Sequence, residues 1–224
     1  MCGRFTITVS VKEIINRFEI QQFVQEQLFS PSFNVAPGQK ILAVINDGSK
    51  NRLGYLKWGL VPPWAKDEKI GYKMINARAE TLADKPSFRH ALKKRRCLIV
   101  ADSFYDWKLQ DPDTKVPMRI KMKSNELFAM AGLWESWKSA NGKIVYSCTI
   151  ITTEANELMK DIHDRMPVIL KKEDEERWLD PSISDTAILM KILKPYDAEK
   201  MEAYEVSTDI NSAKNNFPEL IQRV

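Results

Sequence analysis

The order of short apolar segments constrains the fold of this chain more than any other feature of its sequence. Runs typical of β-strands fall at 41–45, 53–56, 97–101, 116–122, 127–134, 144–152, 166–170 and 201–206. Patterns typical of helices fall at 10–18, 86–94, 153–161, 173–179 and 184–193. A parallel sheet needs a crossover helix between successive strands, and this irregular order does not supply one. We therefore expect an α+β fold, with a largely antiparallel curved sheet or a partly closed barrel and peripheral helices.

Length and composition are those of an ordinary folded protein. The chain has 224 residues, and ~150 residues is typical of one domain, so we expect a single domain over 1–224. Hydrophobic residues make up 44% and charged residues 29%, which argues against intrinsic disorder. No apolar run approaches the ~20 residues of a membrane-spanning helix. The first residues also lack the apolar stretch of a secretory signal, so we expect a cytoplasmic protein without membrane contact.

Three cysteines and two histidines limit the metal and disulfide chemistry that this chain can support. Cys2, Cys97 and Cys148 are far apart and never in a CxxC spacing. This pattern argues against a disulfide framework and against a structural zinc site. We therefore expect no metal and no organic cofactor. The net charge of +4 allows binding to nucleic acid without demonstrating it.

Cys2 stands out because of its position. We expect the initiator methionine to be removed, since the second residue is small. The chain would then begin with an α-amine, pKa ~7.7–8.0, beside a thiol with a pKa of ~8.5. Near neutral pH a useful fraction of each group is nucleophilic. Such a 1,2-aminothiol can condense with an aldehyde to an imine and then close a five-membered thiazolidine ring.

A series of short motifs runs in order along nearly the whole chain. The motifs are MCGRF at 1–5, FNVAPG at 33–38, WGLVPPW at 58–64, INARAET at 75–81, FYDW at 104–107, AGLWE at 131–135 and IHDRMPVIL at 162–170. The series resembles the SRAP family, the SOS response-associated peptidases or abasic-site processing proteins, in its bacterial stand-alone form. The resemblance implies a single SRAP-like domain that senses abasic sites in single-stranded DNA. It further implies a covalent thiazolidine cross-link that shields the lesion and a protein that needs no protein partner.

The resemblance also implies a set of catalytic residues. Cys2 matches the family nucleophile, and Asn76 matches an asparagine that can hold the sugar or the N-terminal residue without acting as a base. His163 matches a histidine that can move protons around the imine or the ring oxygen, since imidazole titrates near neutral pH.

Asp106 is a departure from the family pattern, which has glutamate at this place. The carboxylate is kept, but it is set back by one methylene, roughly 1.5 Å. Because a misplacement of ~1 Å can cost on the order of 100-fold in rate, we expect cross-linking to survive but to be slower. A shifted loop that brings Asp106 closer is the alternative.

Several residues in or near the motifs suit contacts with DNA. Arginine side chains beside the catalytic residues match phosphate oxygens, and an exposed tryptophan can stack on a base. We expect Trp58 to belong to the core and Trp64 to be the stacking residue. Thr153 is expected at a helix start, where backbone amides can meet a phosphate. The candidate DNA-binding residues are Arg4, Pro37, Trp64, Arg78, Thr153 and Arg165.

Other functions use the same N-terminus. A thiol autopeptidase would remove what precedes Cys2, but only Met1 stands there, and a general aminopeptidase can do that. A non-covalent reader of modified or damaged DNA would bind reversibly and would tolerate Cys2→Ala. An amidohydrolase with an N-terminal nucleophile would turn over an amide without DNA. A lyase step would cut the DNA strand if the imine underwent elimination before the thiol trapped it as a thiazolidine.

Overall fold

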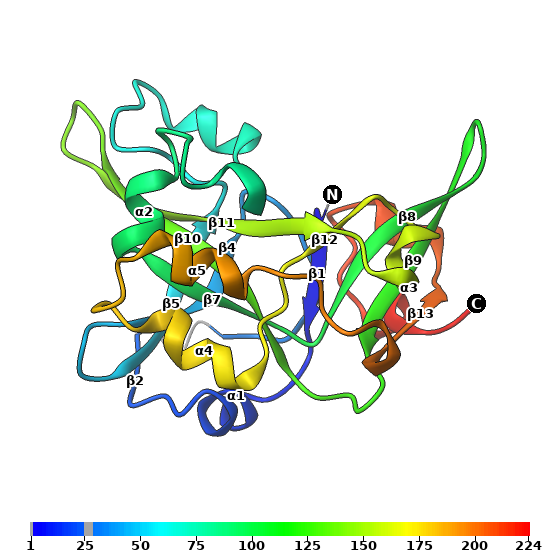
Figure 1. Ribbon diagram of the computed structural model, residues 1–224. Helices are drawn as coiled ribbons and strands as arrows, with labels where there is room; N and C mark the ends of the chain where they lie inside the picture. Colours follow the sequence, from blue (N-terminus) through cyan, green and yellow to red (C-terminus); the bar gives the residue numbers. More distant parts are fainter. Residues whose placement is uncertain (1, 25–28) are drawn as a thin grey trace.

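The larger sheet contains a closed ring of five strands. The computed structural model describes residues 2–24 and 29–224. Around the ring each strand pairs antiparallel with the next, until the last pairs parallel with the first through Ser147–Lys57 and Cys148–Trp58. The ring strands, in spatial order, are β5 (Asn51–Trp58), β4 (Lys40–Asn46), β7 (Arg96–Ala101), β10 (Phe128–Lys138) and β11 (Ile144–Glu154). The expected barrel is thus confirmed (Figure 1).

Three short strands extend this sheet beyond the ring. The strand β2 (Gln22–Phe23) pairs with β5, whereas β6 (Asn76–Arg78) and β12 (Arg165–Pro167) both pair with β11. The strands β6 and β12 flank the far end of β11, because Thr152 pairs with Arg78 on one side and with Pro167 on the other. Residues from two distant parts of the sequence therefore meet over one stretch of β11.

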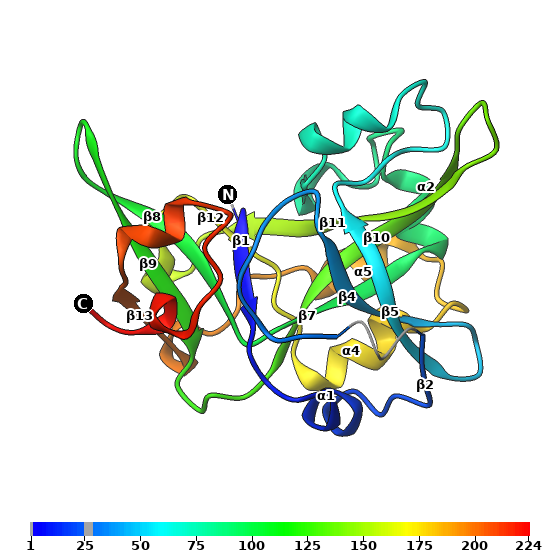
Figure 2. The same ribbon diagram turned by 180° about the vertical axis from the view of Figure 1, so that it is seen from behind.

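A second, five-stranded antiparallel sheet lies beside the barrel (Figure 2). In spatial order its strands are β13 (Met201–Glu205), β9 (Thr114–Met122), β8 (Ser103–Asp111), β1 (Arg4–Ile7) and β3 (Ser32–Val35). The chain passes from β7 of the barrel into β8 of this sheet with only Asp102 between the two strands. This crossing ties the two sheets together through the middle of the molecule.

The helices are short and lie outside the sheets. The α-helices are α1 (Val11–Arg17), α2 (Arg89–Lys94), α3 (Glu157–Lys160), α4 (Lys172–Leu179) and α5 (Thr186–Ile192). The 3-10 helices are η2 (Glu68–Lys73), η3 (Ala79–Thr81), η4 (Ala198–Lys200), η5 (Thr208–Asn211) and η6 (Pro218–Ile221). Helix α1 begins with a capping box between Ser10 and Glu13, as its sequence predicts. The α+β class and the peripheral helices are confirmed.

The core fills the barrel and the space between the two sheets. Trp58 is 1% exposed, as predicted for a core residue, and its ring centroid lies 5.3 Å from that of Phe5 in β1. The Trp58 indole N–H donates to the carbonyl of Ile75 at 2.9 Å. Gly132 is required in β10, because a Cβ there would lie 2.9 Å from the Cys97 sulfur. Within the described residues no helix is long and apolar enough to cross a membrane.

The expected helix at 153–161 is wrong at its start. Thr153 lies inside β11 and pairs with Met166, and its side chain is buried. The helix begins later, with Asn156 as N-cap, whose side chain accepts from the amide of Met159. The β-branched run that favours a strand at 144–152 simply continues through Thr153. The amides of a helix start are therefore not available at Thr153, and its expected role as a DNA contact loses this basis.

Candidate functional site

Cys2 lies where the two sheets meet. Figures 1 and 2 both place the start of β1 beside the ends of β11 and β12. Cys2 directly precedes β1, and its side chain is fully buried. Arg4 pairs with Tyr105 across to β8, so the next residue of β8, Asp106, comes close to the beginning of the chain. The pairing of β1 with β8 thus brings a nucleophile and an acid together from positions a hundred residues apart.

The surroundings of Cys2 keep its thiol protonated. Burial raises the pKa of the Cys2 thiol to about 12, and the negative charge of Asp106 adds to the rise. The backbone N–H of Arg4 donates to the sulfur and lowers this pKa, but it does not offset the burial. Near neutral pH the group is therefore a thiol rather than a thiolate. Any reaction at the sulfur has to remove its proton in the course of the step.

The Asp106 side chain is buried and accepts a hydrogen bond from the next residue of its own strand, β8. Its side chain is 3% exposed, and Oδ1 accepts a hydrogen bond from the amide of Trp107 at 2.9 Å. Because charged carboxylates are strongly hydrated, one buried beside a thiol is typical of functional sites rather than of cores.

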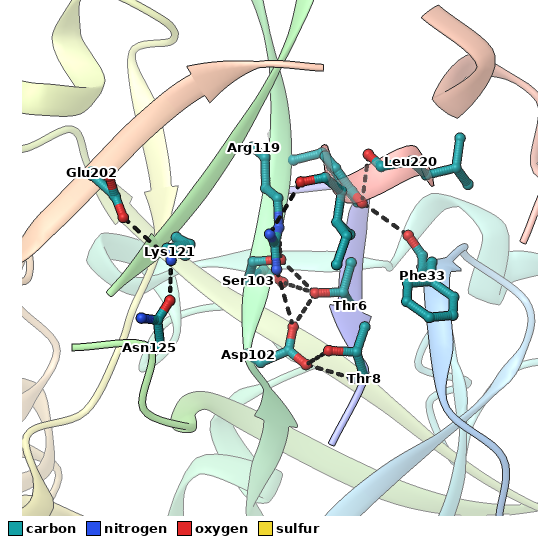
Figure 3. Close-up of polar contacts among 12 residues, drawn as sticks. Thr6, Thr8, Phe33, Asp102, Ser103, Arg119, Lys121, Asn125, Glu202 and Leu220 are labelled. Carbon is teal, nitrogen blue, oxygen red and sulfur yellow. Dashed lines mark hydrogen bonds and ion pairs between the residues drawn. The ribbon is translucent and has the colours of Figure 1, made fainter. Parts of the chain in front are cut away.

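A buried polar network fixes β1 against β8 (Figure 3). The Asp102 carboxylate accepts from the hydroxyls of Thr6 and Thr8, the latter at 2.7 Å, and from the amide of Thr8. The guanidinium of Arg119 donates to the Ser103 hydroxyl at 2.8 Å and lies 3.9 Å from Asp102. A one-residue slip of β1 would break the contacts of Thr6 and Thr8 with Asp102. The network therefore determines where Cys2 stands relative to Asp106.

Asn76 and His163 approach from the two flanks of β11. Asn76 is the first residue of β6, and its side-chain N–H donates to the carbonyl of Ile75 at 3.1 Å. Its amide oxygen is buried and has no hydrogen-bond partner among the described residues. Since a buried acceptor without a donor costs free energy, this oxygen is suited to a donor supplied by a ligand or by the N-terminal residue.

His163 precedes β12 and has two partners at Nδ1. The amide of Arg165 donates to Nδ1 at 3.1 Å, which requires a neutral ring with its lone pair on that atom. The Asp164 carboxylate lies 2.6 Å from the same nitrogen and suits a ring that carries a proton there. Both contacts hold the ring at Nδ1, so the residues that follow His163 fix the orientation of its imidazole.

Two of the three candidate arginines are engaged with protein groups. The Arg4 guanidinium donates to the side chain of Asn34 at 2.7 Å and to the carbonyls of Ile210 and Asn211. The Arg165 guanidinium forms a two-pronged pair with Glu80. Arg78 is exposed, and among the described residues its guanidinium has no hydrogen bond or ion pair.

Trp64 and Pro37 lie at the surface, whereas Thr153 does not. Trp64 is 57% exposed, as a stacking residue requires, and Pro37 is half-buried. Tyr72 in η2 is also exposed, and sequence reasoning missed it. A Cβ at Gly38, next to Pro37, would lie 3.4 Å from the Tyr72 ring. Sequence reasoning also missed Glu80, although this residue belongs to the INARAET motif.

No cluster of metal ligands is present in the part of the chain that the structure describes, where three or more His, Cys, Asp or Glu side chains nowhere converge.

Comparisons with known proteins agree with one another. The family model described as SOS response associated peptidase (SRAP) matches residues 1–213. The abasic site processing protein YoqW of Bacillus subtilis strain 168 is 63% identical over 222 residues, covering 99% of both chains. The abasic site processing protein HMCES of Xenopus tropicalis is 31% identical over 227 residues, covering 88% of this chain and 67% of that protein.

Solved structures share the architecture. A crystal structure of a protein from Bacteroides thetaiotaomicron superposes with a TM-score of 0.90 at 30% identity, covering 100% of both chains. One from Bordetella bronchiseptica superposes with a TM-score of 0.78 over 92% of this chain, but at 24% identity this likeness concerns the fold alone. Because the family model spans all but the last residues and relatives at up to 63% identity cover 99% of the chain, the protein belongs to the SOS response-associated peptidase (SRAP) family.

Proposed function

We propose that this protein processes abasic sites in single-stranded DNA by capturing them covalently through Cys2. The relatives at 63% and 31% identity are named abasic site processing proteins. The observation that carries the proposal is a buried Cys2 thiol beside the Asp106 carboxylate, at the second position of the chain. Removal of Met1 would expose an α-amine on the same residue. The product is a thiazolidine that shields the lesion.

The reaction is a condensation that releases one water molecule. The Cys2 amine adds to the aldehyde carbon of the ring-opened sugar, and loss of water gives an imine. The sulfur then bonds to the same carbon, while the thiol proton ends on the former imine nitrogen, which closes the five-membered ring. The high pKa of the thiol keeps the sulfur protonated until the imine is in place.

Each candidate residue has a role in these reaction steps. Asp106 handles the proton transfers at Cys2, because its charge acts directly on that thiol. His163 handles those at the sugar, since contacts at Nδ1 with Arg165 and Asp164 hold its ring in place beside the site. The unsatisfied amide oxygen of Asn76 accepts from a sugar hydroxyl or from the Cys2 amine.

Binding to the strand relies on charge and stacking rather than on sequence. Arg78 is the first candidate for a phosphate, because its guanidinium is exposed and has no hydrogen bond or salt bridge within the described residues. Trp64 offers an exposed ring face to a base beside the lesion, and Pro37 lines the same approach. Affinity should therefore fall with salt and should depend on strand state far more than on sequence.

A thiol autopeptidase is the second candidate, and the description of the family model favours it. Its substrate would be the bond between Met1 and Cys2. In that case purified protein that still carries Met1 would remove it without any other enzyme, whereas Cys2→Ala that still carries Met1 would keep it. The capture proposal makes no demand on how Met1 is removed.

The test is capture of an abasic site under denaturing conditions. Purified protein is mixed with single-stranded DNA that carries one abasic site, beside undamaged DNA and a Cys2→Ala variant. We expect a band that survives denaturation only with wild-type protein and damaged DNA. If no band forms although intact mass confirms loss of Met1, the capture proposal is wrong. Reversible binding that is equal in Cys2→Ala would then identify a non-covalent reader.

A further inference from the structure

Glu80 and Arg165 form a two-pronged ion pair beside the candidate catalytic residues. The Nη1 and Nη2 atoms of Arg165 donate to the two carboxylate oxygens of Glu80 at 2.8 and 2.9 Å. The Arg165 side chain is 12% exposed and that of Glu80 is 50% exposed. Fork-to-fork pairs of this kind are the most directional ion pairs that proteins form. Hydrogen bonds from Arg165 also lower the pKa of Glu80, so the carboxylate is charged at neutral pH.

The pair spans β11 from one flank to the other. Glu80 lies in η3, which directly follows β6, whereas Arg165 is the first residue of β12. Nη2 of Arg165 also donates to the carbonyl of Thr152 in β11 at 2.7 Å. Three strands are therefore fastened together at one point. The residues that this point connects are Asn76, four positions before Glu80, and His163, two positions before Arg165.

The same contacts leave Arg165 poorly placed for a phosphate. Glu80 occupies the end of the guanidinium, Thr152 takes a further N–H, and Nε is buried without a partner among the described residues. A phosphate could take the end of the fork only by displacing the Glu80 carboxylate. The pair also carries no net charge, so it adds little to the attraction of a polyanion.

We propose that Glu80 is a positioning residue for capture, which clamps the segment that carries Asn76 to the segment that carries His163 through Arg165. This inference rests on the proposed function. The clamp sets the distance between the amide that holds the sugar and the imidazole that moves its protons. Binding of the single-stranded DNA itself does not need the clamp, because Arg78 and Trp64 are not members of the Glu80–Arg165 pair.

The test is Glu80→Gln, which keeps the size of the side chain and removes its charge. Capture is measured at increasing concentrations of single-stranded abasic DNA, which yields a maximal rate and a half-saturating concentration. We expect the maximal rate to fall by ~10-fold or more, because displacements of ~1 Å have effects of this size. The half-saturating concentration and its salt dependence should change no more than in Glu157→Gln, which removes the same single negative charge. Glu157→Gln is the control, since Glu157 forms an ion pair with Lys160 at the surface.

Two results would overturn the inference. An unchanged maximal rate would mean that the clamp positions nothing. A half-saturating concentration well below that of Glu157→Gln, with no loss of maximal rate, would mean that Glu80 merely competes with a phosphate for Arg165.

Hydrogen exchange separates this inference from the proposed function. The amide of Arg165, which donates to His163, should exchange faster in Glu80→Gln than in wild-type protein without any DNA. If wild-type protein captures nothing, the proposed function fails, and exchange still decides whether the clamp exists. Unchanged exchange would remove the clamp whatever the capture assay shows.

Discussion

The two halves of the candidate site are held by different means. Cys2 and Asp106 depend on β1 and β8, which are fastened by the buried network around Asp102. Asn76 and His163 depend on β6 and β12, which are fastened by the half-exposed pair of Glu80 and Arg165. A buried network loses much stability when one member is removed, whereas an exposed pair loses little. Cys2, the candidate nucleophile, is therefore held by the buried part of the fold, whereas Asn76 and His163 are held by a pair at its surface.

The largest effect on stability is expected when the buried network around Asp102 is disrupted. Asp102→Ala leaves the amide and hydroxyl of Thr8 and the charge of Arg119 without their buried acceptor. We expect the free energy of unfolding to fall by ~3–5 kcal/mol, as for other buried pairs that lose one partner. Urea unfolding measures this. Glu157→Gln should show no measurable change, and a similarly small loss in Asp102→Ala would refute the contrast between the two halves.

The next largest effect is expected in Asp106→Asn, which should make the Cys2 thiol more reactive but slow its capture of abasic DNA. Besides burial, the charge of Asp106 raises the pKa of the Cys2 thiol, so Asp106→Asn should lower that pKa. More thiolate then exists at pH 9, and alkylation of Cys2 by iodoacetamide should be several-fold faster. Capture should slow by on the order of 100-fold, because the acid–base group is gone. Peptide mass spectrometry and the capture assay measure the two rates.

Asp106→Glu is the companion variant. It supplies the glutamate that the resemblance of motifs implies at this position, and we expect it to capture faster than the wild-type protein. An unchanged rate would show that the shorter side chain is no handicap here. Alkylation that is unchanged in Asp106→Asn would show that its charge does not reach the thiol.

The smallest effect is expected when the exposed Arg78 is changed, and it concerns the affinity for single-stranded DNA. Arg78→Gln should weaken binding to single-stranded DNA uniformly across sequences, since one phosphate contact is lost. The slope of log affinity against log salt should fall by ~0.7, the value for one contact on a single strand. Arg177→Gln is the matched control, because Arg177 is exposed on α4 and pairs with Asp174. Equal slopes for both variants would remove Arg78 from the interface.

Long apolar strands of this fold are predictable from sequence, and the strands that carry the site are not. The runs at 97–101 and 144–152 predict β7 and β11, because most of their side chains are buried. The strands β1 and β6 are short and mix charged and apolar residues, and their partners β8 and β11 are far away in the chain. Local patterns contain no information about such pairing.

The candidate site was identified by the resemblance of motifs rather than by physical pattern. Once the fold is known, physical reasons for some of those motif residues become visible, such as the pairing of Glu80 with Arg165 across β11. Thr153 shows the opposite case, where the residue expected to start a helix lies inside β11 and the helix begins later. The assigned roles of Cys2, Asn76, Asp106 and His163 stay predictions until capture is measured.

The most direct test of the central claim compares Cys2→Ser with the wild-type protein. The serine variant keeps the amine after Met1 removal but has no thiol, so it can form an imine and cannot close a thiazolidine. Each protein is incubated with single-stranded abasic DNA, with and without borohydride, and the adducts are weighed intact. The account predicts a wild-type adduct without borohydride, at the mass of protein plus DNA minus one water, and a serine adduct only with borohydride. A stable serine adduct without borohydride would contradict it.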